Sequence, residues 1–235
     1  MSAFRWEAGQ AGSLSLLEGD AGAGAFPGLV DIQVGDAAPV LIPAARVEET
    51  AGGALAHGNA AGFEARLVLT AHPHGRLDAW DLTLTLRCLD ELAGAVQARL
   101  AFQLPASAGE PWFLLPGIVY GENRLPNCTR LYPRFTRGEP GDTLTSDRWA
   151  FRADRCATPV VLAAGTERGV ALAVDETGEL GLQGLGFAHP RGQEPVVWLD
   201  FPYREEPVTY TGPGQAEAPD RPGHRWTAGE THRFT

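Results

Sequence analysis

The sequence predicts an all-β protein, a large two-sheet antiparallel β-sandwich. Three observations predict this fold: segments in which apolar and polar residues alternate, frequent glycine and proline, and no segment with the period of a long helix. The chain has 29 glycines and 18 prolines in 235 residues, and their scatter at short intervals is typical of short strands joined by turns. Because β-sandwiches of this length form one domain, we expect a single domain over residues 1–235.

The clearest strands lie before residue 105. Apolar residues occupy every second position of the segments 63–70, 81–88 and 96–104, and polar residues stand between most of them. Such alternation places one side of a strand on a core and the other toward solvent. We interpret the segments 81–88 and 96–104 as an antiparallel hairpin and 63–70 as the strand before it, so that the three form a meander.

Four further segments, 160–164, 169–175, 180–187 and 196–201, have β-type composition and are separated by turn residues. They predict a second meander, and the segment 226–235 has the pattern of a turn that enters a strand. Two groups of strands with one apolar face each must bury those faces against each other, which gives two sheets about 10 Å apart.

Charge, terminal segments and cysteine usage limit the partners and the location that the sequence predicts. The net charge of −10 repels nucleic acid and anionic lipid, so we expect no nucleic-acid and no membrane partner. The amino terminus has no signal-peptide pattern and no segment is apolar enough to span a bilayer, which predicts a cytoplasmic protein. The odd number of cysteines, without CxxC spacing, indicates free thiols at Cys88, Cys128 and Cys156.

Two polar motifs are weak candidates for catalysis or metal binding. The spacing of His72 and His74 suits a metal, but Pro73 favours an exposed turn. Glu205 and Glu206 are adjacent, so a regular strand would point them to opposite faces rather than toward one glycosidic bond. The sequence therefore predicts no catalytic residue, no metal site and no cofactor.

The segment between residues 110 and 151 lacks alternation and is rich in aromatic, arginine, asparagine, proline and glycine residues. We interpret it as an irregular crossing, and long loops on a rigid sandwich often contact ligands. Aromatic faces beside amide and guanidinium donors suit a sugar, whose C–H face stacks and whose hydroxyls need hydrogen bonds. The candidate ligand-binding residues are Trp112, Tyr120, Asn123, Arg124, Tyr132, Arg134 and Trp149. In the alternative, these aromatics cap the open end of the core and the arginines bind loop carbonyls.

Several segments resemble one known group of proteins: 112–124, 132–135, 149–155, 201–210 and 228–230. They are similar to the amino-terminal β-sandwich of bacterial proteins related to six-hairpin (α/α)-barrel glycosidases. In that group the sandwich belongs to the galactose-mutarotase-like super-sandwich class and precedes a helical catalytic barrel.

The resemblance implies a non-catalytic domain that packs on a glycoside hydrolase-like helical barrel encoded after Thr235, contributes to its substrate cleft, and has carbohydrate as its ligand. Two alternatives stay open. One is a free-standing aldose epimerase that uses a histidine and a carboxylate. The other is a carbohydrate-binding or protein-interaction module without an attached enzyme.

Overall fold

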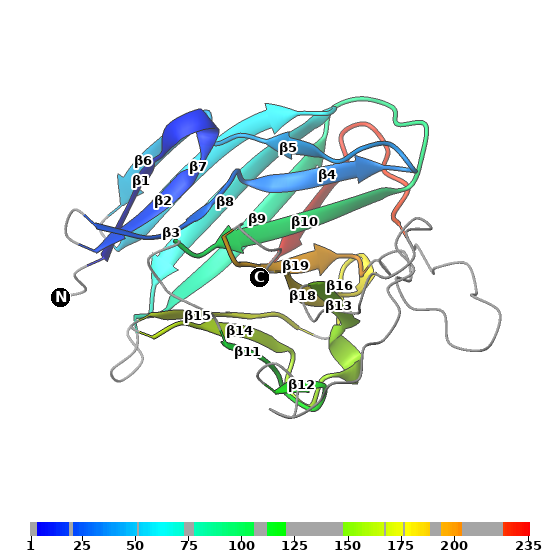
Figure 1. The fold of residues 1–235 in the computed structure, drawn as a ribbon. Helices are drawn as coiled ribbons and strands as arrows, with labels where there is room; N and C mark the ends of the chain where they lie inside the picture. The colour runs from blue at the N-terminus through cyan, green and yellow to red at the C-terminus, as the bar shows by residue number, and fades with distance from the viewer. Residues whose placement is uncertain are drawn as a thin grey trace, which may run out of the picture.

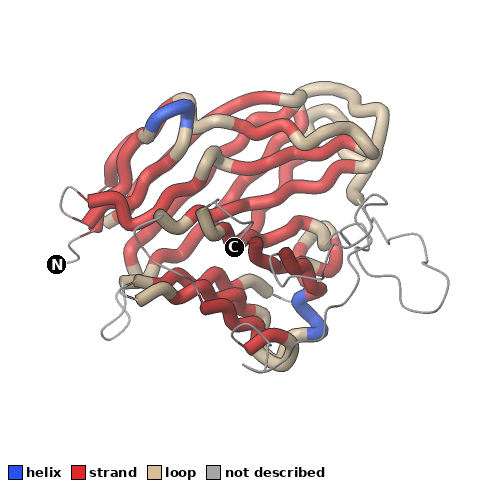
Figure 2. Tube along the Cα trace, in the orientation of Figure 1, coloured by secondary structure: helices blue, strands red, loops and turns tan. Residues whose placement is uncertain are grey.

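The computed structural model describes residues 4–18, 21–50, 52–72, 78–105, 112–120, 148–166, 168–175, 177–188, 194–203 and 223–235. Within these residues the chain consists of β-strands and two short 3₁₀ turns, Gln10–Gly12 and Ala153–Arg155, with no α-helix (Figures 1 and 2). No helix in these ranges is long and apolar enough to cross a membrane. The predicted all-β fold is confirmed.

The largest sheet has nine strands among the described residues, in the order β1-β2-β3-β10-β19-β18-β13, and β4 and β5 extend from β10. These strands are β1 (Phe4–Ala8), β2 (Leu14–Glu18), β3 (Ala21–Phe26), β4 (Val30–Val34), β5 (Val40–Ile42), β10 (Val96–Gln103), β13 (Arg148–Arg152), β18 (Gly184–Ala188) and β19 (Val196–Phe201). In its centre β10 pairs with β19, so segments about a hundred residues apart become neighbours.

A five-stranded sheet lies behind the nine-stranded one in Figure 1, in the order β20-β9-β8-β7-β6. Its strands are β6 (Arg46–Thr50), β7 (Gly53–Ala60), β8 (Phe63–Ala71), β9 (Trp80–Cys88) and β20 (Thr231–Phe234). The connection between β7 and β8 is the pair Ala61 and Gly62, with φ of 52° and 77°. Positive φ at both positions is the feature of a two-residue hairpin turn whose twist matches that of the strands.

Two smaller sheets complete the described fold. One has the order β12-β11-β14-β15, and the other is the pair β16-β17. The strands are β11 (Trp112–Leu115), β12 (Val119–Tyr120), β14 (Val160–Ala164), β15 (Gly169–Ala173), β16 (Thr177–Gly178) and β17 (Gly181–Leu182). Phe113 of β11 stacks on Phe187 of β18 with ring centroids 4.1 Å apart, which joins the four-stranded sheet to the nine-stranded sheet.

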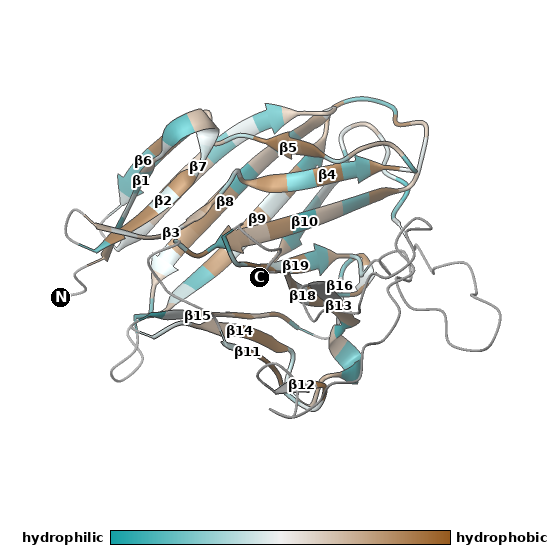
Figure 3. Cartoon of the chain, in the orientation of Figure 1, coloured by the Kyte–Doolittle hydropathy of each residue, from teal (hydrophilic) through white to brown (hydrophobic). Residues whose placement is uncertain are grey.

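Apolar side chains of the two large sheets meet in a common core. Trp6 of β1 packs edge-on against Trp80 of β9 with ring centroids 5.7 Å apart. Phe201 of β19 packs on Phe234 of β20 at 4.6 Å. The predicted core side of β8 is buried as expected from its alternation: Phe63, Ala65, Leu67 and Leu69. Facing apolar sides of this kind are what hold a β-sandwich together, and Figure 3 shows apolar positions along the strands of both sheets.

One ion pair lies buried between β10 and β19. The guanidinium of Arg99 donates to both carboxylate oxygens of Asp200, at 2.7 and 3.1 Å, and lies 4.5 Å from the ring centroid of Trp198. The indole N–H of Trp198 also donates to Asp200, at 3.1 Å. Asp200 is fully buried, and a buried carboxylate is tolerated because charged and neutral donors surround it.

One predicted strand pairing is wrong. The segments 81–88 and 96–104 do not form a hairpin, because β9 pairs with β8 and β20 whereas β10 pairs with β3, β4 and β19 in the other sheet. The connection 89–95 therefore crosses between sheets, and β7 takes the third place in the meander. Alternation specifies which side of a strand is apolar, but it does not specify the neighbouring strand.

Two further interpretations need correction. The second meander is divided: β14 pairs with β15 and β18 pairs with β19, but the two hairpins lie in different sheets. The segment 110–151 is not one irregular crossing, because it contains β11, β12 and β13. The run Trp112–Leu115 shows no alternation because both sides of β11 are apolar, which removes the period-two signal. As predicted, Cys88 and Cys156 are free and buried, whereas Cys128 lies outside the described residues.

Candidate functional site

The outward side of the four-stranded sheet is apolar along β11, β14 and β15. Strand register places Trp112 opposite Ala164, which in turn lies opposite Gly169. The outward side chains, here called the Trp112 face, are Trp112, Leu114, Val160, Leu162, Ala164, Ala171 and Ala173. Figure 3 shows β11 and β14 as mainly hydrophobic. The solvent side of an antiparallel sheet commonly carries polar residues, so an apolar outward face marks a candidate contact surface.

Trp112 is the predicted site residue that the structure describes most fully. Its side chain is 46% exposed, although large apolar side chains in the described residues are mostly buried. Tyr120 lies in β12, where the register pairs it with Leu114, so Trp112 and Tyr120 belong to adjacent strands. Trp149 lies in β13, in the nine-stranded sheet. Four predicted ligand-binding residues lie outside the described residues: Asn123, Arg124, Tyr132 and Arg134. The residues His74, Glu205 and Glu206 of the two polar motifs also lie outside them.

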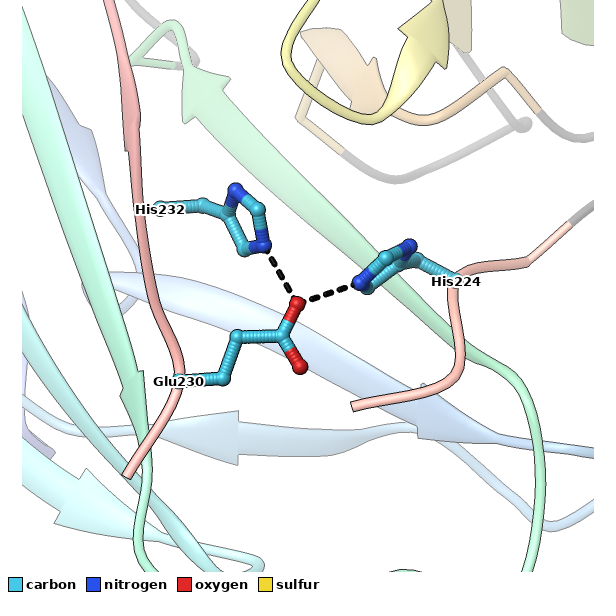
Figure 4. A group of neighbouring side chains, drawn as sticks. All are labelled: His224, Glu230 and His232. Atoms are coloured by element: carbon cyan, nitrogen blue, oxygen red, sulfur yellow. Dashed lines mark hydrogen bonds and ion pairs between the residues drawn. The ribbon is translucent and has the colours of Figure 1, made fainter. Parts of the chain in front are cut away.

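A second group of polar side chains lies beside the C-terminal strand β20. His224 forms a β-bridge with Val96, the first residue of β10. Glu230 immediately precedes β20, and its carbonyl accepts a hydrogen bond from the backbone N–H of Cys88 in β9. His232 lies within β20 opposite Leu86 of β9. Figure 4 shows the side chains of His224, Glu230 and His232 pointing toward one another; they are called the histidine cluster below.

The carboxylate of Glu230 is the centre of this cluster. Its Oε1 lies 2.5 Å from Nε2 of His224 and 2.6 Å from Nε2 of His232. Its Oε2 accepts from the backbone N–H of Thr227 at 2.7 Å and from the Thr227 hydroxyl at 3.2 Å. One carboxylate oxygen is therefore fixed by the turn before β20, and the other faces the two imidazoles.

A second carboxylate supports the cluster from outside. Oε2 of Glu179, in the β16–β17 turn, lies 2.8 Å from Nδ1 of His232 and accepts from the backbone N–H of Arg233 at 3.2 Å. This contact requires a proton on Nδ1 of His232, because an ionised carboxylate only accepts hydrogen bonds. The orientation of the His232 ring is thus set by Glu179, with Nε2 directed at Glu230.

These hydrogen bonds stabilise the ionised form of both acids. The pKa of Glu230 is lowered to about 2, first by the hydrogen bond from His232, then by the backbone N–H of Thr227 and the contact with His224. The pKa of Glu179 is also lowered, chiefly by its hydrogen bond with His232. Both side chains are therefore carboxylates at neutral pH.

The two imidazole rings rest on the aromatic core. Trp226 is 4% exposed and packs edge-on against His232 and His224, at centroid distances of 4.8 and 5.6 Å. Trp226 in turn packs on Phe63 of β8 at 5.0 Å. The side chains of the cluster keep contact with solvent, since that of His224 is 33% exposed. The cluster is thus rigidly supported on one side and accessible on the other.

The sequence analysis assigned no role to His224, Glu230 or His232. A usable signal is present, because Glu230 and His232 are two residues apart at the start of a predicted strand and so share one side of it. His224 could not be added from the sequence, since it reaches the cluster through its bridge to β10.

Comparison of the chain with protein-family models, curated proteins and solved structures gives no match. The resemblance to the glycosidase-associated super-sandwich therefore stays a prediction. The two sites rest on their own geometry.

Proposed function

We propose that this chain is a non-catalytic β-sandwich domain of a carbohydrate-active protein, and that its Trp112 face contacts the carbohydrate. The observation that carries the proposal is the 46% exposure of Trp112 on an outward face that is otherwise aliphatic. An indole ring presents a large flat apolar surface, which suits the C–H face of a sugar ring.

The neighbours of Trp112 favour access to its ring. Its partner across the strand pair is Ala164, and the next strand presents Gly169 at the same level. A methyl group and a hydrogen atom are too short to cover an indole. A ligand can therefore approach the ring from the side of β14 and β15.

The geometry of the histidine cluster argues against this cluster as the acid and base of an aldose epimerase. An epimerase needs an acid and a base on opposite sides of a sugar ring. Glu230 lies within 2.6 Å of both imidazoles, and Glu179 lies 2.8 Å from His232. No sugar ring fits between groups in direct contact.

The proposal includes a downstream helical domain on which the sandwich packs. Its support is the resemblance of segments such as 112–124 and 201–210 to glycosidase-associated sandwiches. Reading the gene beyond the codon for Thr235 tests this part. A helical repeat region in frame is the expected result, and a stop codon at that point would refute it.

Binding is tested with purified protein on a panel of polysaccharides by affinity electrophoresis and pull-down. The variant Trp112→Ala should weaken binding by about tenfold or more, since loss of an aromatic anchor costs at least about 1.4 kcal/mol. Leu89→Ala is the matched control, because Leu89 is a 44% exposed apolar residue away from this sheet.

Both variants should keep the unfolding midpoint of the parent protein. Binding by Trp112→Ala that equals that of the parent and of Leu89→Ala would remove the Trp112 face from carbohydrate recognition. Failure of the parent protein to bind any polysaccharide in the panel would count against the carbohydrate role of the isolated domain.

A further inference from the structure

The histidine cluster assembles a donor set for a metal ion. One ring nitrogen of His224, one ring nitrogen of His232 and one oxygen of Glu230 all lie within 4.8 Å of one another, and each belongs to a partly exposed residue. We propose that these three residues bind a divalent transition-metal ion of the Zn²⁺ class. Two imidazoles and one carboxylate are a donor set that Zn²⁺ accepts.

The spacing of the donors requires an adjustment. Ligands of a tetrahedral Zn²⁺ lie about 2.0–2.1 Å from the ion and therefore about 3.3 Å from one another. Oε1 of Glu230 lies 2.5 and 2.6 Å from the two nitrogens. The two nitrogens lie within 4.8 Å of each other. Binding therefore requires the glutamate and imidazole side chains to move until the three donors lie about 3.3 Å apart around the ion.

The surrounding hydrogen bonds match those of metal sites. Histidines that bind metals usually donate their other ring N–H to a carboxylate or carbonyl, and ligating carboxylates are themselves hydrogen-bonded. Nδ1 of His232 faces Glu179 at 2.8 Å, and the second oxygen of Glu230 accepts from Thr227. These contacts direct Nε2 of His232 and Oε1 of Glu230 toward the same point.

Charge also favours a cation at this point. The carboxyl groups of Glu230 and Glu179 contact the two ring nitrogens of His232, and the whole chain carries a net charge of −10. The single oxygen Oε1 of Glu230 faces both imidazole nitrogens, at 2.5 and 2.6 Å. A divalent ion satisfies both nitrogens and the carboxylate together.

The site joins three parts of the fold. His224 is bridged to β10 of the nine-stranded sheet, and His232 belongs to β20 of the five-stranded sheet. Glu179 adds the β16–β17 turn. A bound ion therefore ties the C-terminal strand to both large sheets, and its removal should lower the stability of the protein.

The test uses the full chain without a polyhistidine tag, stripped with EDTA and titrated with Co²⁺ and Zn²⁺. Visible absorption of Co²⁺ and calorimetry of Zn²⁺ should each show one equivalent bound. His224→Ala and His232→Ala should abolish the stoichiometric step, and Glu179→Gln should weaken it by about 10- to 100-fold. His72→Ala is the control, because His72 is an exposed histidine 3.5 Å from a carboxylate, Asp81.

Thermal unfolding separates loss of the site from loss of the fold. Zn²⁺ should raise the melting temperature of the parent and of His72→Ala, and leave that of the His224→Ala and His232→Ala proteins unchanged. Equal metal binding by the parent and by the double variant His224→Ala/His232→Ala would overturn the proposal. Failure of the parent protein to bind Co²⁺ or Zn²⁺ would also overturn the proposal. The cluster would then be a hydrogen-bonded group that stabilises the fold without a metal ion.

Discussion

Removal of the guanidinium of Arg99 should strongly destabilise the protein. The carboxylate of Asp200 is fully buried and receives two hydrogen bonds from Arg99. Arg99 also opposes the effect of burial on Asp31, whose pKa burial raises. In the variant Arg99→Met, Asp200 keeps the indole N–H of Trp198 but loses the charge and both hydrogen bonds of Arg99. Breaking a buried ion pair from one side costs about 3–5 kcal/mol.

For a chain of this size, that cost lowers the melting temperature by about 6–20 °C. Urea unfolding followed by far-UV circular dichroism measures the loss in the free energy of unfolding, with Arg152→Met as the control. Arg152 and Asp154 also form a two-bond pair, but their side chains are 31% and 30% exposed, so the control should lose less than about 1 kcal/mol.

The double variant Arg99→Met/Asp200→Asn tests the electrostatic origin of the loss. It should recover a large part of the stability, because the fully buried carboxylate of Asp200 is replaced by a neutral amide. A loss in Arg99→Met no larger than in Arg152→Met would refute the reasoning, as would a double variant less stable than Arg99→Met.

Three further predictions concern the acid response, the core and one turn. With EDTA present, the ionised form of Glu230 stabilises the fold above pH 4.5, and this contribution is lost as pH falls from 4.5 toward 2. The pH profile of unfolding should therefore be flatter over this range in Glu230→Gln, and parallel profiles of the two proteins would contradict this. Leu67→Ala should cost about 2–5 kcal/mol in urea unfolding because Leu67 is fully buried, whereas Leu89→Ala should change stability by less than about 0.5 kcal/mol. Ala61→Gly should raise the melting temperature. The reason is that a φ of 52°, as at Ala61, costs about 1 kcal/mol for any residue that has a side chain. A lower melting temperature of the variant would show that this strain is absent.

The sequence predicted strands where one side of the strand meets polar surroundings. Residues 63–70 and 81–88 alternate because β8 and β9 have one buried side, and the structure places both close to the expected bounds. The strand β11 was not predicted, because both of its sides are apolar. Its four residues are all apolar, with Phe113 and Leu115 buried and Trp112 on the outward face, so no alternation marks it.

The two candidate sites differ in how much of each could be predicted from the sequence. Trp112 was predicted from its residue type and its aromatic surroundings; its side chain is 46% exposed, and its contact role stays a prediction. The histidine cluster was not predicted, because its members come from a bridge to β10, a turn and a strand. Residue spacing identifies Glu230 and His232 as neighbours on one side of the chain, but not His224.

The amino-acid sequence by itself determined the all-β class and the buried side of the alternating strands, because residue alternation is a local property of an extended chain. The tertiary structure alone decided that β9 and β10 belong to different sheets, and that two histidines and two carboxylates converge beside β20. Strand pairing and side-chain convergence depend on how the apolar faces pack against one another across the whole chain, which no single segment specifies.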